Sequence, residues 1–325
     1  MPTLAFVFPG QGSQAVGMGH ALAEVFPAAA AVFAEVDDVL DERLAALAWN
    51  GPAEELDLTV NAQPALLVAS IAFLRALQER RGAVGLPPLV PDFAAGHSMG
   101  QYTAMVAAGV LSLADGIRLV RERGRLMQAS GEGHPGAMAA IIGLPDERLD
   151  VLVASGAAHG TFGVANRNSP GQVVVSGARP AVEAAAAAAK GLGAKRAIVL
   201  PVSVAAHSPL MAEAAEGMRA VLADVDFRDP RVPLLANADA RLLTTAAACR
   251  AELVDHLTTG VDWIAAVESM TAAGVSRFVE VGPGRVLSGL IRRISPDAET
   301  LPLDDPGAPG GLADLDAPAD HAAAT

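Results

Sequence analysis

The pentapeptide Gly96-His97-Ser98-Met99-Gly100 sets a serine between two glycines, directly after a short apolar stretch and before a helical one. A strand-to-helix turn of this kind is typical of a nucleophile elbow, in which small flanking residues permit a sharp turn that exposes the hydroxyl. The alternative is an ordinary tight turn with a helix-capping serine. Because the turn follows an apolar strand, we interpret Ser98 as a nucleophile.

A serine hydroxyl becomes a strong nucleophile only beside a base, and the chain contains seven histidines. His207 is the best placed of them, because it follows an expected strand at residues 196–202 and precedes the helix start Ser208-Pro209. A helix N-terminus disfavours the imidazolium, so we expect His207 to be neutral near pH 7 and available as the base. The alternative is a capping or core histidine.

Arg123 occupies an unusual position for a charged residue. In the helix expected after Ser112, rotation by about 100° per residue places Arg123 in the middle of the apolar face, whereas Arg121 and Arg125 fall on the opposite half. A buried guanidinium without a partner costs on the order of several kcal/mol, so a carboxylate must meet it. That carboxylate belongs either to an Asp or Glu of the chain or to a substrate, to which arginine offers two parallel hydrogen bonds.

The loop after the first apolar stretch contains a competing motif. Its pattern Gly10-x-Gly12-x-x-Ala15 resembles a dinucleotide-binding fingerprint, and Glu35 or Asp37 follows at a suitable distance for a ribose contact. Nothing downstream indicates hydride chemistry, however.

The same loop has an alternative role beside a serine nucleophile. The backbone N–H of Gln11 would point at an oxyanion, and the N–H of Met99, the residue after the serine, would be the second donor. Pro9 stiffens the entry to the loop, which is unfavourable for the dinucleotide interpretation.

The chain alternates strands with helices that could position these residues. Apolar strands are expected at residues 4–8, 93–95 and 277–281, and amphipathic helices at 18–39, from 63, up to 108, from 112, 208–225 and 262–273. The alternation predicts an α/β fold with a mostly parallel sheet that helices cover on both faces.

The segment between residues 136 and 203 has a different order. Strands are expected at 137–142, 162–165, 173–176 and 196–202, with helices at 146–154 and 181–192. This β-α-β-β-α-β order predicts a ferredoxin-like domain. We therefore expect a catalytic domain at residues 1–132 and 204–301, a ferredoxin-like insert at 133–203, and a disordered tail at 302–325 that carries acidic residues and no Lys or Arg.

The composition excludes several classes of protein. With 325 residues, 52% of them hydrophobic, the chain can bury a large core, and its formal charge of −13 argues against nucleic acid or an anionic membrane as the main partner. One cysteine, Cys249, excludes a disulfide framework and a multi-cysteine metal site. No stretch approaches the roughly 20 apolar residues of a membrane span, and no signal peptide is recognisable, so we expect a cytoplasmic protein.

Six motifs, in order along the chain, resemble the malonyl-CoA:acyl carrier protein transacylase family. They are Phe8-Pro9-Gly10-Gln11-Gly12-Ser13-Gln14, Gln63-Pro64-Ala65-Leu66, Gly96-His97-Ser98-Met99-Gly100, Arg123-Gly124, Asn168-Ser169-Pro170-Gly171-Gln172 and Val279-Glu280-Val281-Gly282-Pro283-Gly284. The resemblance implies an α/β-hydrolase-like large domain with a mostly parallel sheet and an inserted ferredoxin-like small domain.

The resemblance also implies a role for each candidate residue. Ser98 would accept the acyl group, His207 would be its base, and Arg123 would bind the malonyl carboxylate. The backbone groups of Gln11 and Met99 would stabilise the oxyanion.

The partners follow from the same resemblance. Malonyl-CoA would be the substrate and an acyl carrier protein the acceptor, in a ping-pong transfer that needs no cofactor or metal. Gln63 would lie near the acyl pocket.

Two positions depart from the family pattern. His256 stands where relatives often carry Gln or Asn near the catalytic histidine; a role of the backbone carbonyl would survive this change, whereas a role of the side chain would be altered. Ala205-Ala206 before His207 matches neither the malonyl type nor the methylmalonyl type of modular acyltransferase. The acyl selectivity is therefore open.

A serine thioesterase or related hydrolase with the same elbow is the main alternative function. Asp115, Asp146 and Asp150 are available by position as the acid of a triad. The pathway is open as well, because fatty acid synthesis, polyketide assembly and malonate decarboxylase priming all use similar transacylases.

Acyl carrier proteins are acidic, as this chain is, so docking would need a local basic patch. Two clusters are candidates, Arg118, Arg121 and Arg125 on one helical face, and Lys190, Lys195 and Arg196 in the expected insert. An ordinary solvated surface is the alternative for either cluster.

Overall fold

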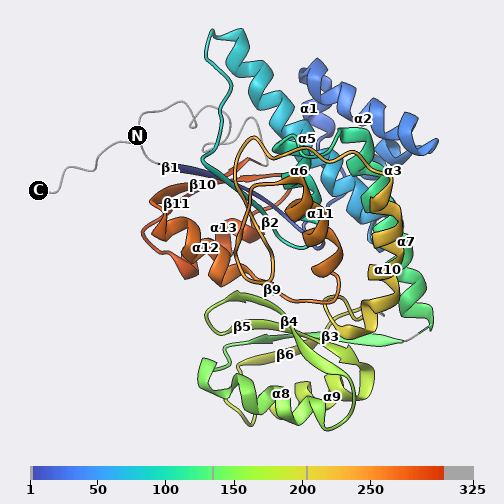
Figure 1. The fold of residues 1–325 in the computed structure, drawn as a ribbon, viewed down its shortest axis with the longest axis vertical. Coiled ribbons are helices and arrows are strands. Elements are labelled where there is room, and N and C mark those ends of the chain that lie inside the picture. The colour runs from blue at the N-terminus through green and yellow to red at the C-terminus, as the bar shows by residue number, and fades with distance from the viewer. Residues whose placement is uncertain (1–2, 134, 203, 304–325) are drawn as a thin grey trace, which may run out of the picture.

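The computed structural model describes residues 3–133, 135–202 and 204–303. Its helices are α1 (His20–Val25), α2 (Pro27–Leu40), α3 (Leu44–Asn50), α4 (Ala53–Leu56), α5 (Thr59–Ala83), α6 (Gly100–Ala107), α7 (Leu113–Gly133), α8 (Leu149–Ala157), α9 (Arg179–Ala189), α10 (Ala212–Ala223), α11 (Ala246–Asp255), α12 (Trp263–Ala272) and α13 (Val286–Ile294). The strands belong to two sheets, one in each lobe of the molecule (Figure 1).

The larger sheet has the strand order β11-β10-β1-β2-β7-β8. Its strands are β1 (Thr3–Phe8), β2 (Phe93–Gly96), β7 (Leu234–Leu235), β8 (Leu242–Leu243), β10 (Val275–Val281) and β11 (Glu299–Leu303). The pairs from β11 to β7 are all parallel, and β8 runs antiparallel to β7. The predicted α/β fold with a mostly parallel sheet is confirmed.

Alternate residues of β1 face two different cores, because successive side chains of a strand point to opposite faces. Phe6 and Phe8 belong to the larger core, together with buried residues of α2, α5, α6 and α7. Ala5 and Val7 belong to a smaller core with α12 and α13. Helices therefore cover both faces of the sheet, as the alternation of elements predicts (Figure 1).

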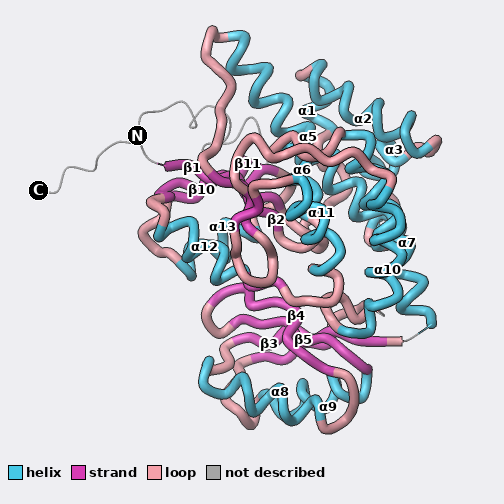
Figure 2. Tube along the Cα trace, viewed as in Figure 1, coloured by secondary structure: helices cyan, strands magenta, loops and turns pink. Residues whose placement is uncertain are grey.

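The smaller sheet has the order β6-β3-β5-β4-β9. Its strands are β3 (Gly136–Ile142), β4 (Phe162–Ser169), β5 (Gln172–Ala178), β6 (Arg196–Val199) and β9 (Val261–Asp262). Neighbours from β6 to β4 are antiparallel, and α8 and α9 pack on the face turned away from the larger lobe (Figure 2). These elements follow one another as β-α-β-β-α-β, and β9 joins them from the later part of the chain, parallel to β4.

One expected boundary is wrong. Pro302 and Leu303 belong to β11 and pair with β10, so the tail cannot begin at residue 302. The catalytic segment expected at 204–301 therefore extends at least to Leu303. The expected tail beyond Leu303 lies outside the described residues, and the boundaries between 1–132, 133–203 and the segment from 204 stay a prediction.

The helix expected from residue 63 begins earlier, at Thr59, and contains Pro64 in its interior. A proline has no N–H, so the carbonyl four residues before it loses its helical donor. Here that carbonyl belongs to Val60, and Arg121 Nη1 donates to it at 3.0 Å. The arginine replaces the missing helical bond, which is why α5 continues through the proline.

The expected helix at residues 18–39 is divided into α1 and α2, because Pro27 starts a new helix.

The expectation about membrane spans also needs correction. By length and composition alone, α5 could cross a bilayer, contrary to the expectation that no stretch would suffice, but 78% of its apolar window is buried inside the protein. It is the central helix of the larger core.

Candidate active site

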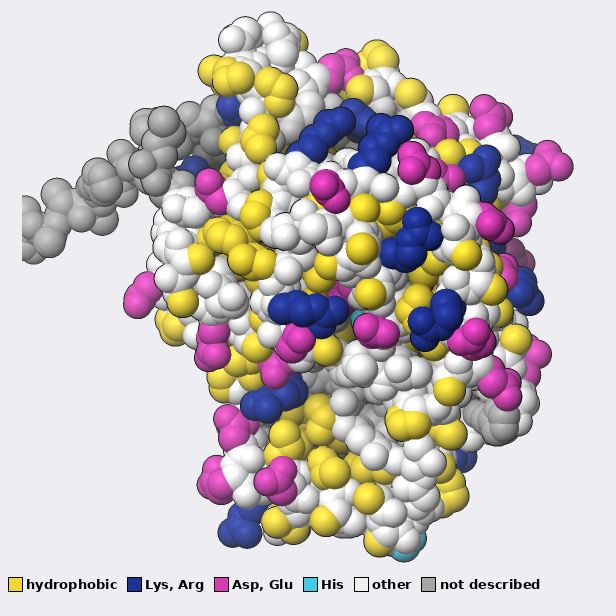
Figure 3. All heavy atoms as spheres, in the orientation of Figure 1, with side chains coloured by type: hydrophobic (Ala, Val, Ile, Leu, Met, Phe, Trp, Pro, Cys, Tyr) yellow, Lys and Arg dark blue, Asp and Glu magenta, His cyan; other side chains and the backbone are white. Residues whose placement is uncertain are grey.

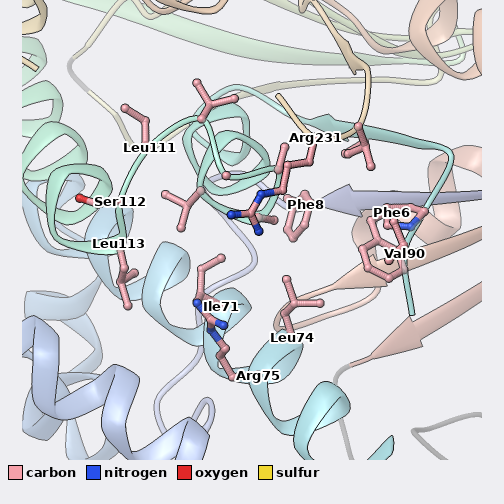
Figure 4. Close-up of a pocket in the computed structure, with 18 of the residues that line it drawn as sticks. Phe6, Phe8, Ile71, Leu74, Arg75, Val90, Leu111, Ser112, Leu113 and Arg231 are labelled. Carbon is pink, nitrogen blue, oxygen red and sulfur yellow. The ribbon is translucent and has the colours of Figure 1, made fainter. Parts of the chain in front are cut away.

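One cavity lies apart from the predicted nucleophile, base and binding residues; of the candidate triad acids, only Asp115 lines it. It has a volume of about 560 Å³ and lies between α5 and the larger sheet, with Phe8, Ile71, Arg75 and Arg231 around it (Figure 4). Its lining does not include Ser98, so this cavity is not the site of the predicted nucleophile.

A second cavity, of about 480 Å³, holds most of the predicted site residues. Ser98, His207, Arg123, Gln11 and Met99 all line it. It opens where the chain leaves the carboxyl ends of the adjacent strands β1 and β2, with β3 and β5 of the smaller sheet opposite. Ligands of open α/β sheets bind at such strand ends. The site is therefore formed between the two lobes.

The serine lies on a strained turn that only glycines can flank. Ser98 has φ of 53°, a left-handed conformation that costs on the order of 1–2 kcal/mol for a residue with a side chain. A Cβ on Gly96 would lie 2.0 Å from the carbonyl of Gly100, and a Cβ on Gly100 would lie 2.2 Å from the carbonyl oxygen of Phe8. The turn thus has the geometry of a nucleophile elbow.

The serine and histidine predicted from the sequence are in contact. Ser98 Oγ lies 2.8 Å from His207 Nε2. On the other side of the ring, His207 Nδ1 lies 2.6 Å from the carbonyl oxygen of His256 and 3.1 Å from that of Thr259. Carbonyl oxygens only accept, so Nδ1 carries the ring proton and Nε2 has a free lone pair for the serine hydroxyl.

The imidazole is neutral, although for a different reason from the one expected. Burial, with a further contribution from the charge of Arg123, lowers the pKa of His207 to about 4. The predicted helix start is present: Ser208 Oγ accepts from the N–H of Leu210, and the short 3₁₀ helix Pro209–Met211 leads into α10 at Ala212.

Two carbonyls take the place that a carboxylate has in a catalytic triad. Among the described residues, no Asp or Glu lies within hydrogen-bonding distance of His207. Asp115 instead accepts a hydrogen bond from Ser112 Oγ at the start of α7. Asp146 lies in a short 3₁₀ helix and Asp150 in α8, on the outer side of the smaller sheet. The positions proposed for a triad acid are thus not used in that way.

Arg123 is buried, as the helical periodicity predicts, with 2% of its surface exposed. Its Nη1 donates to Gln63 Oε1 at 2.7 Å, and its Nη2 donates to Ser98 Oγ at 3.2 Å. Its Nε has no partner, and no carboxylate of the described residues pairs with it. Burial accordingly lowers the pKa of Arg123. An internal ion pair, one of the two interpretations, is wrong for this part of the chain.

Gln63 lies behind Arg123 rather than at the cavity surface. Its Nε2 donates to Thr59 Oγ1 at 3.0 Å, and Thr59 Oγ1 donates to Gln11 Oε1 at 2.8 Å. A chain of side chains therefore connects the guanidinium with the loop after β1. Gln63 fixes the orientation of Arg123 through Nη1, while Nη2 stays beside Ser98 Oγ at the cavity.

The proposed oxyanion donors have no competing acceptors. Among the described residues, neither the backbone N–H of Gln11 nor that of Met99 donates to another group of the protein, and both residues line the cavity beside Ser98. Two free N–H groups next to a nucleophile can stabilise a negative oxygen.

The dinucleotide interpretation of the first loop does not fit the structure. A fingerprint glycine loop leads directly into a helix whose N-terminus binds the pyrophosphate, but α1 begins only at His20, well after Gly12. Asp37, one candidate for the ribose contact, accepts a hydrogen bond from the backbone N–H of Ala45 instead.

The two departures from the family pattern have clear positions. His256 contacts His207 through its backbone carbonyl, while its own ring is buried, with neither nitrogen hydrogen-bonded to a described residue. Burial holds the pKa of His256 well below its usual value. Ala206 lines the cavity, whereas Ala205 is fully buried beneath it.

Two asparagines at the site were given no role of their own in the sequence analysis. Asn237 accepts a hydrogen bond from the backbone N–H of Ser98 at 2.8 Å. Asn168, on β4, places its Oδ1 2.8 Å from His97 Nε2 and so links the elbow to the smaller sheet. Asn168 was part of a recognised motif, whereas Asn237 follows β7, a strand of two residues that gives almost no periodic signal.

Comparisons with known proteins agree with this geometry. The acyl transferase domain family matches residues 5–300. The malonyl CoA-acyl carrier protein transacylase of Escherichia coli (strain K12) is 45% identical over 97% of this chain and 100% of its own length.

Solved structures give the same result. An acyl carrier protein S-malonyltransferase from Vibrio cholerae superposes with a TM-score of 0.87 and 43% identity, over 93% of this chain and 97% of its own. A malonyl-transacylase in complex with a type II PKS acyl-carrier protein gives a TM-score of 0.90 at 43% identity, over 96% and 98%. The chain therefore belongs to the acyl transferase family, and within it to the malonyl-CoA:acyl carrier protein transacylases.

Proposed function

We propose that this chain moves a malonyl group from malonyl-CoA to the phosphopantetheine thiol of an acyl carrier protein through an acyl-enzyme on Ser98. The observation that carries the proposal is the buried guanidinium of Arg123, which has no carboxylate partner among the described residues and lies 3.2 Å from Ser98 Oγ. A short acyl group on that oxygen would bring a carboxylate at its far end to the guanidinium, so the site favours a dicarboxylic half-thioester.

In the first half-reaction, Ser98 Oγ attacks the thioester carbonyl while His207 Nε2 takes the hydroxyl proton. The N–H groups of Gln11 and Met99 stabilise the tetrahedral oxyanion. The carbon–sulfur bond then breaks, and His207 returns the proton to the CoA sulfur. The products are free CoA and a malonyl ester on Ser98.

The second half-reaction is the reverse sequence with a different thiol. His207 takes the proton of the carrier thiol, whose sulfur attacks the malonyl ester, and then returns the proton to Ser98 Oγ. A neutral imidazole is required at the start of both halves, in keeping with the lowered pKa of His207.

A direct test supplies malonyl-CoA together with holo carrier protein and measures malonyl thioester on the carrier. We expect transfer to the holo carrier and none to the apo carrier, which lacks the thiol. Rapid release of free malonate without any carrier would instead favour the hydrolase alternative. Parallel reactions with methylmalonyl-CoA determine the acyl selectivity, which Ala205-Ala206 leaves open.

The two basic clusters differ in their charge environment. Arg118, Arg121 and Arg125 each pair with an acid, namely Asp115, Glu42 and Glu122. Lys190, Lys195 and Arg196 form no ion pair with a described residue. Over the face in Figure 3, basic and acidic side chains are interspersed. The cluster in the smaller lobe is therefore the better candidate for contact with an acidic carrier.

We also propose a cytoplasmic location, consistent with a single, buried cysteine.

The pH profile of acylation tests the role of His207. Because the imidazole becomes protonated only near its pKa of about 4, the base stays functional well below the usual histidine range. We expect the acylation rate, measured by rapid mixing with malonyl-CoA, to stay level from pH 8 down to about 5.5 and to fall as the pH approaches about 4. An inflection between pH 6 and 7 would contradict a buried, neutral base.

Replacing His256 tests whether its backbone or its side chain matters. In His256→Met the carbonyl that holds His207 Nδ1 remains, while a ring with two unpaired nitrogens is removed. We expect malonyl transfer within about twofold of the wild type and an unchanged or higher melting temperature, because unpaired buried polar groups are costly. A large loss of transfer with an intact fold would assign the role to the imidazole ring.

A further inference from the structure

The side chain of Asn237 forms a bracket on the elbow. Its Oδ1 accepts from the backbone N–H of Ser98 at 2.8 Å, and its Nδ2 donates to the backbone carbonyl of Gly96 at 3.1 Å. One amide thus joins the two ends of the bend that carries the nucleophile. The assignment of oxygen and nitrogen is unambiguous, because the backbone N–H can only donate and the carbonyl can only accept.

Asn237 is itself held in place. It is 3% exposed, its backbone N–H donates to Glu252 Oε1 at 2.7 Å, and its carbonyl accepts from the N–H of Asp262 at 2.7 Å. Glu252 is buried and also pairs with Arg241. The backbone N–H, the backbone carbonyl, Oδ1 and Nδ2 of Asn237 each make a hydrogen bond, which makes it a rigid support for the elbow.

We propose that Asn237 is a positioning residue that holds the strained backbone of Ser98 and so keeps its hydroxyl aligned with His207. The left-handed conformation of Ser98 is unfavourable by itself and persists only where the surroundings impose it. The bracket also occupies the N–H of Ser98, so that the next N–H, that of Met99, is the one left free for the oxyanion. Asn237 is not itself a lining residue of the cavity, and it holds Ser98 through the backbone N–H and not through Oγ.

This inference rests on the proposed function only for the identity of the acyl donor. It predicts a specific split in Asn237→Ala: the reactivity of Ser98 falls, whereas the affinity for malonyl-CoA, which depends on Arg123, does not. Misplacement of a reacting group by about 1 Å costs on the order of 10²-fold. We expect a loss of that size in the acylation rate. The affinity is measured in proteins that cannot be acylated, and Ser98→Ala and Ser98→Ala/Asn237→Ala should have the same Kd for malonyl-CoA.

The experiment measures three quantities for each variant: the rate of Ser98 labelling by a fluorophosphonate probe, the rate of malonylation, and the melting temperature. The probe reports an activated serine without requiring malonyl recognition. Gln78→Ala is the matched control, because Gln78 brackets the backbone of Leu89 through two hydrogen bonds of 2.9 and 3.0 Å, away from the elbow. The control should lose stability and keep the wild-type labelling rate.

Slower labelling in Asn237→Ala with unchanged affinity supports the inference. Wild-type labelling, or an affinity loss as large as the loss of labelling, overturns it. In Asn237→Asp with the carboxylate ionised, one oxygen still accepts from the Ser98 N–H, but the other faces the Gly96 carbonyl oxygen, to which it cannot donate, so labelling should be slower than in the wild type. If the alanine variant does not fold, the Asp variant decides: wild-type labelling overturns the inference and slower labelling supports it.

A wild-type protein that is labelled by the probe but takes no malonyl group contradicts the proposed function and leaves this inference standing.

Discussion

Replacing His207 by alanine is expected to lower the rate of malonyl transfer by about 10²- to 10⁴-fold, the range attributable to a positioned general base. Among the residues that the structure describes, His207 is the only base within hydrogen-bonding distance of Ser98 Oγ, and its Nε2 lies 2.8 Å away. Without it the serine keeps its proton, and neither the attack on the thioester nor the protonation of the leaving thiol is assisted. The measurement is the single-turnover rate of acylation by malonyl-CoA at pH 8.

The half-buried His20 provides the control for this prediction. It lies on α1, stacks on Trp49 and takes no part in the site, so His20→Ala should transfer malonyl at the wild-type rate. If His207→Ala were acylated as fast as the control, the histidine would be a structural residue and the base would have to be sought elsewhere.

Replacing Arg123 by alanine is expected to separate two substrates. Truncating one partner of a buried, hydrogen-bonded charge pair costs about 2–5 kcal/mol, and each 1.36 kcal/mol is a factor of ten. We therefore expect kcat/KM for malonyl-CoA to fall by about 30- to 5,000-fold. Acetyl-CoA has no distal carboxylate, so its slow transfer should change little. The assay is run at pH 8, because loss of the nearby cation raises the pKa of His207.

The Arg123→Met variant shows whether this loss reflects function or folding. The guanidinium is 2% exposed and has no carboxylate partner among the described residues. Its removal eliminates the cost of burying a charge, several kcal/mol in real proteins, against about 1–3 kcal/mol for the acceptor left on Gln63. We expect loss of malonyl transfer with no fall in melting temperature.

Arg125 is the matched control on the same helix. It is exposed and pairs with Glu122, so Arg125→Ala should leave both substrates unaffected. Equal losses for malonyl-CoA and acetyl-CoA in Arg123→Ala would show that the arginine supports the catalytic geometry in general and does not select a carboxylate.

Local patterns predicted much of the fold, and long-range contacts decided the rest. The continuous apolar run at residues 4–8 and the helix expected after Ser112 depend on neighbours in sequence, and both are found in the structure, as β1 and α7. The interior position of Pro64 in α5 depends on Arg121, which is distant in sequence and reaches the Val60 carbonyl. A proline indicates a helix start when only its own segment is considered.

The site shows the same division. Arg123 could be recognised because the helical period placed a charge on an apolar face. The neutral state of His207 was also predicted, but its cause, burial beside a second charge, is a property of the assembled site. Asn237 could not be recognised, since it follows a strand of two residues and its role comes from a contact with Ser98 across the sheet.

The mass of the intact protein after incubation with malonyl-CoA tests the central claim most directly. A covalent malonyl ester should appear on the wild-type chain, map to Ser98 after digestion, and disappear on addition of holo acyl carrier protein. Ser98→Ala should remain at its unmodified mass under the same conditions. An adduct that persists in Ser98→Ala, or transfer to the carrier without any adduct on the wild type, would contradict a serine-bound intermediate.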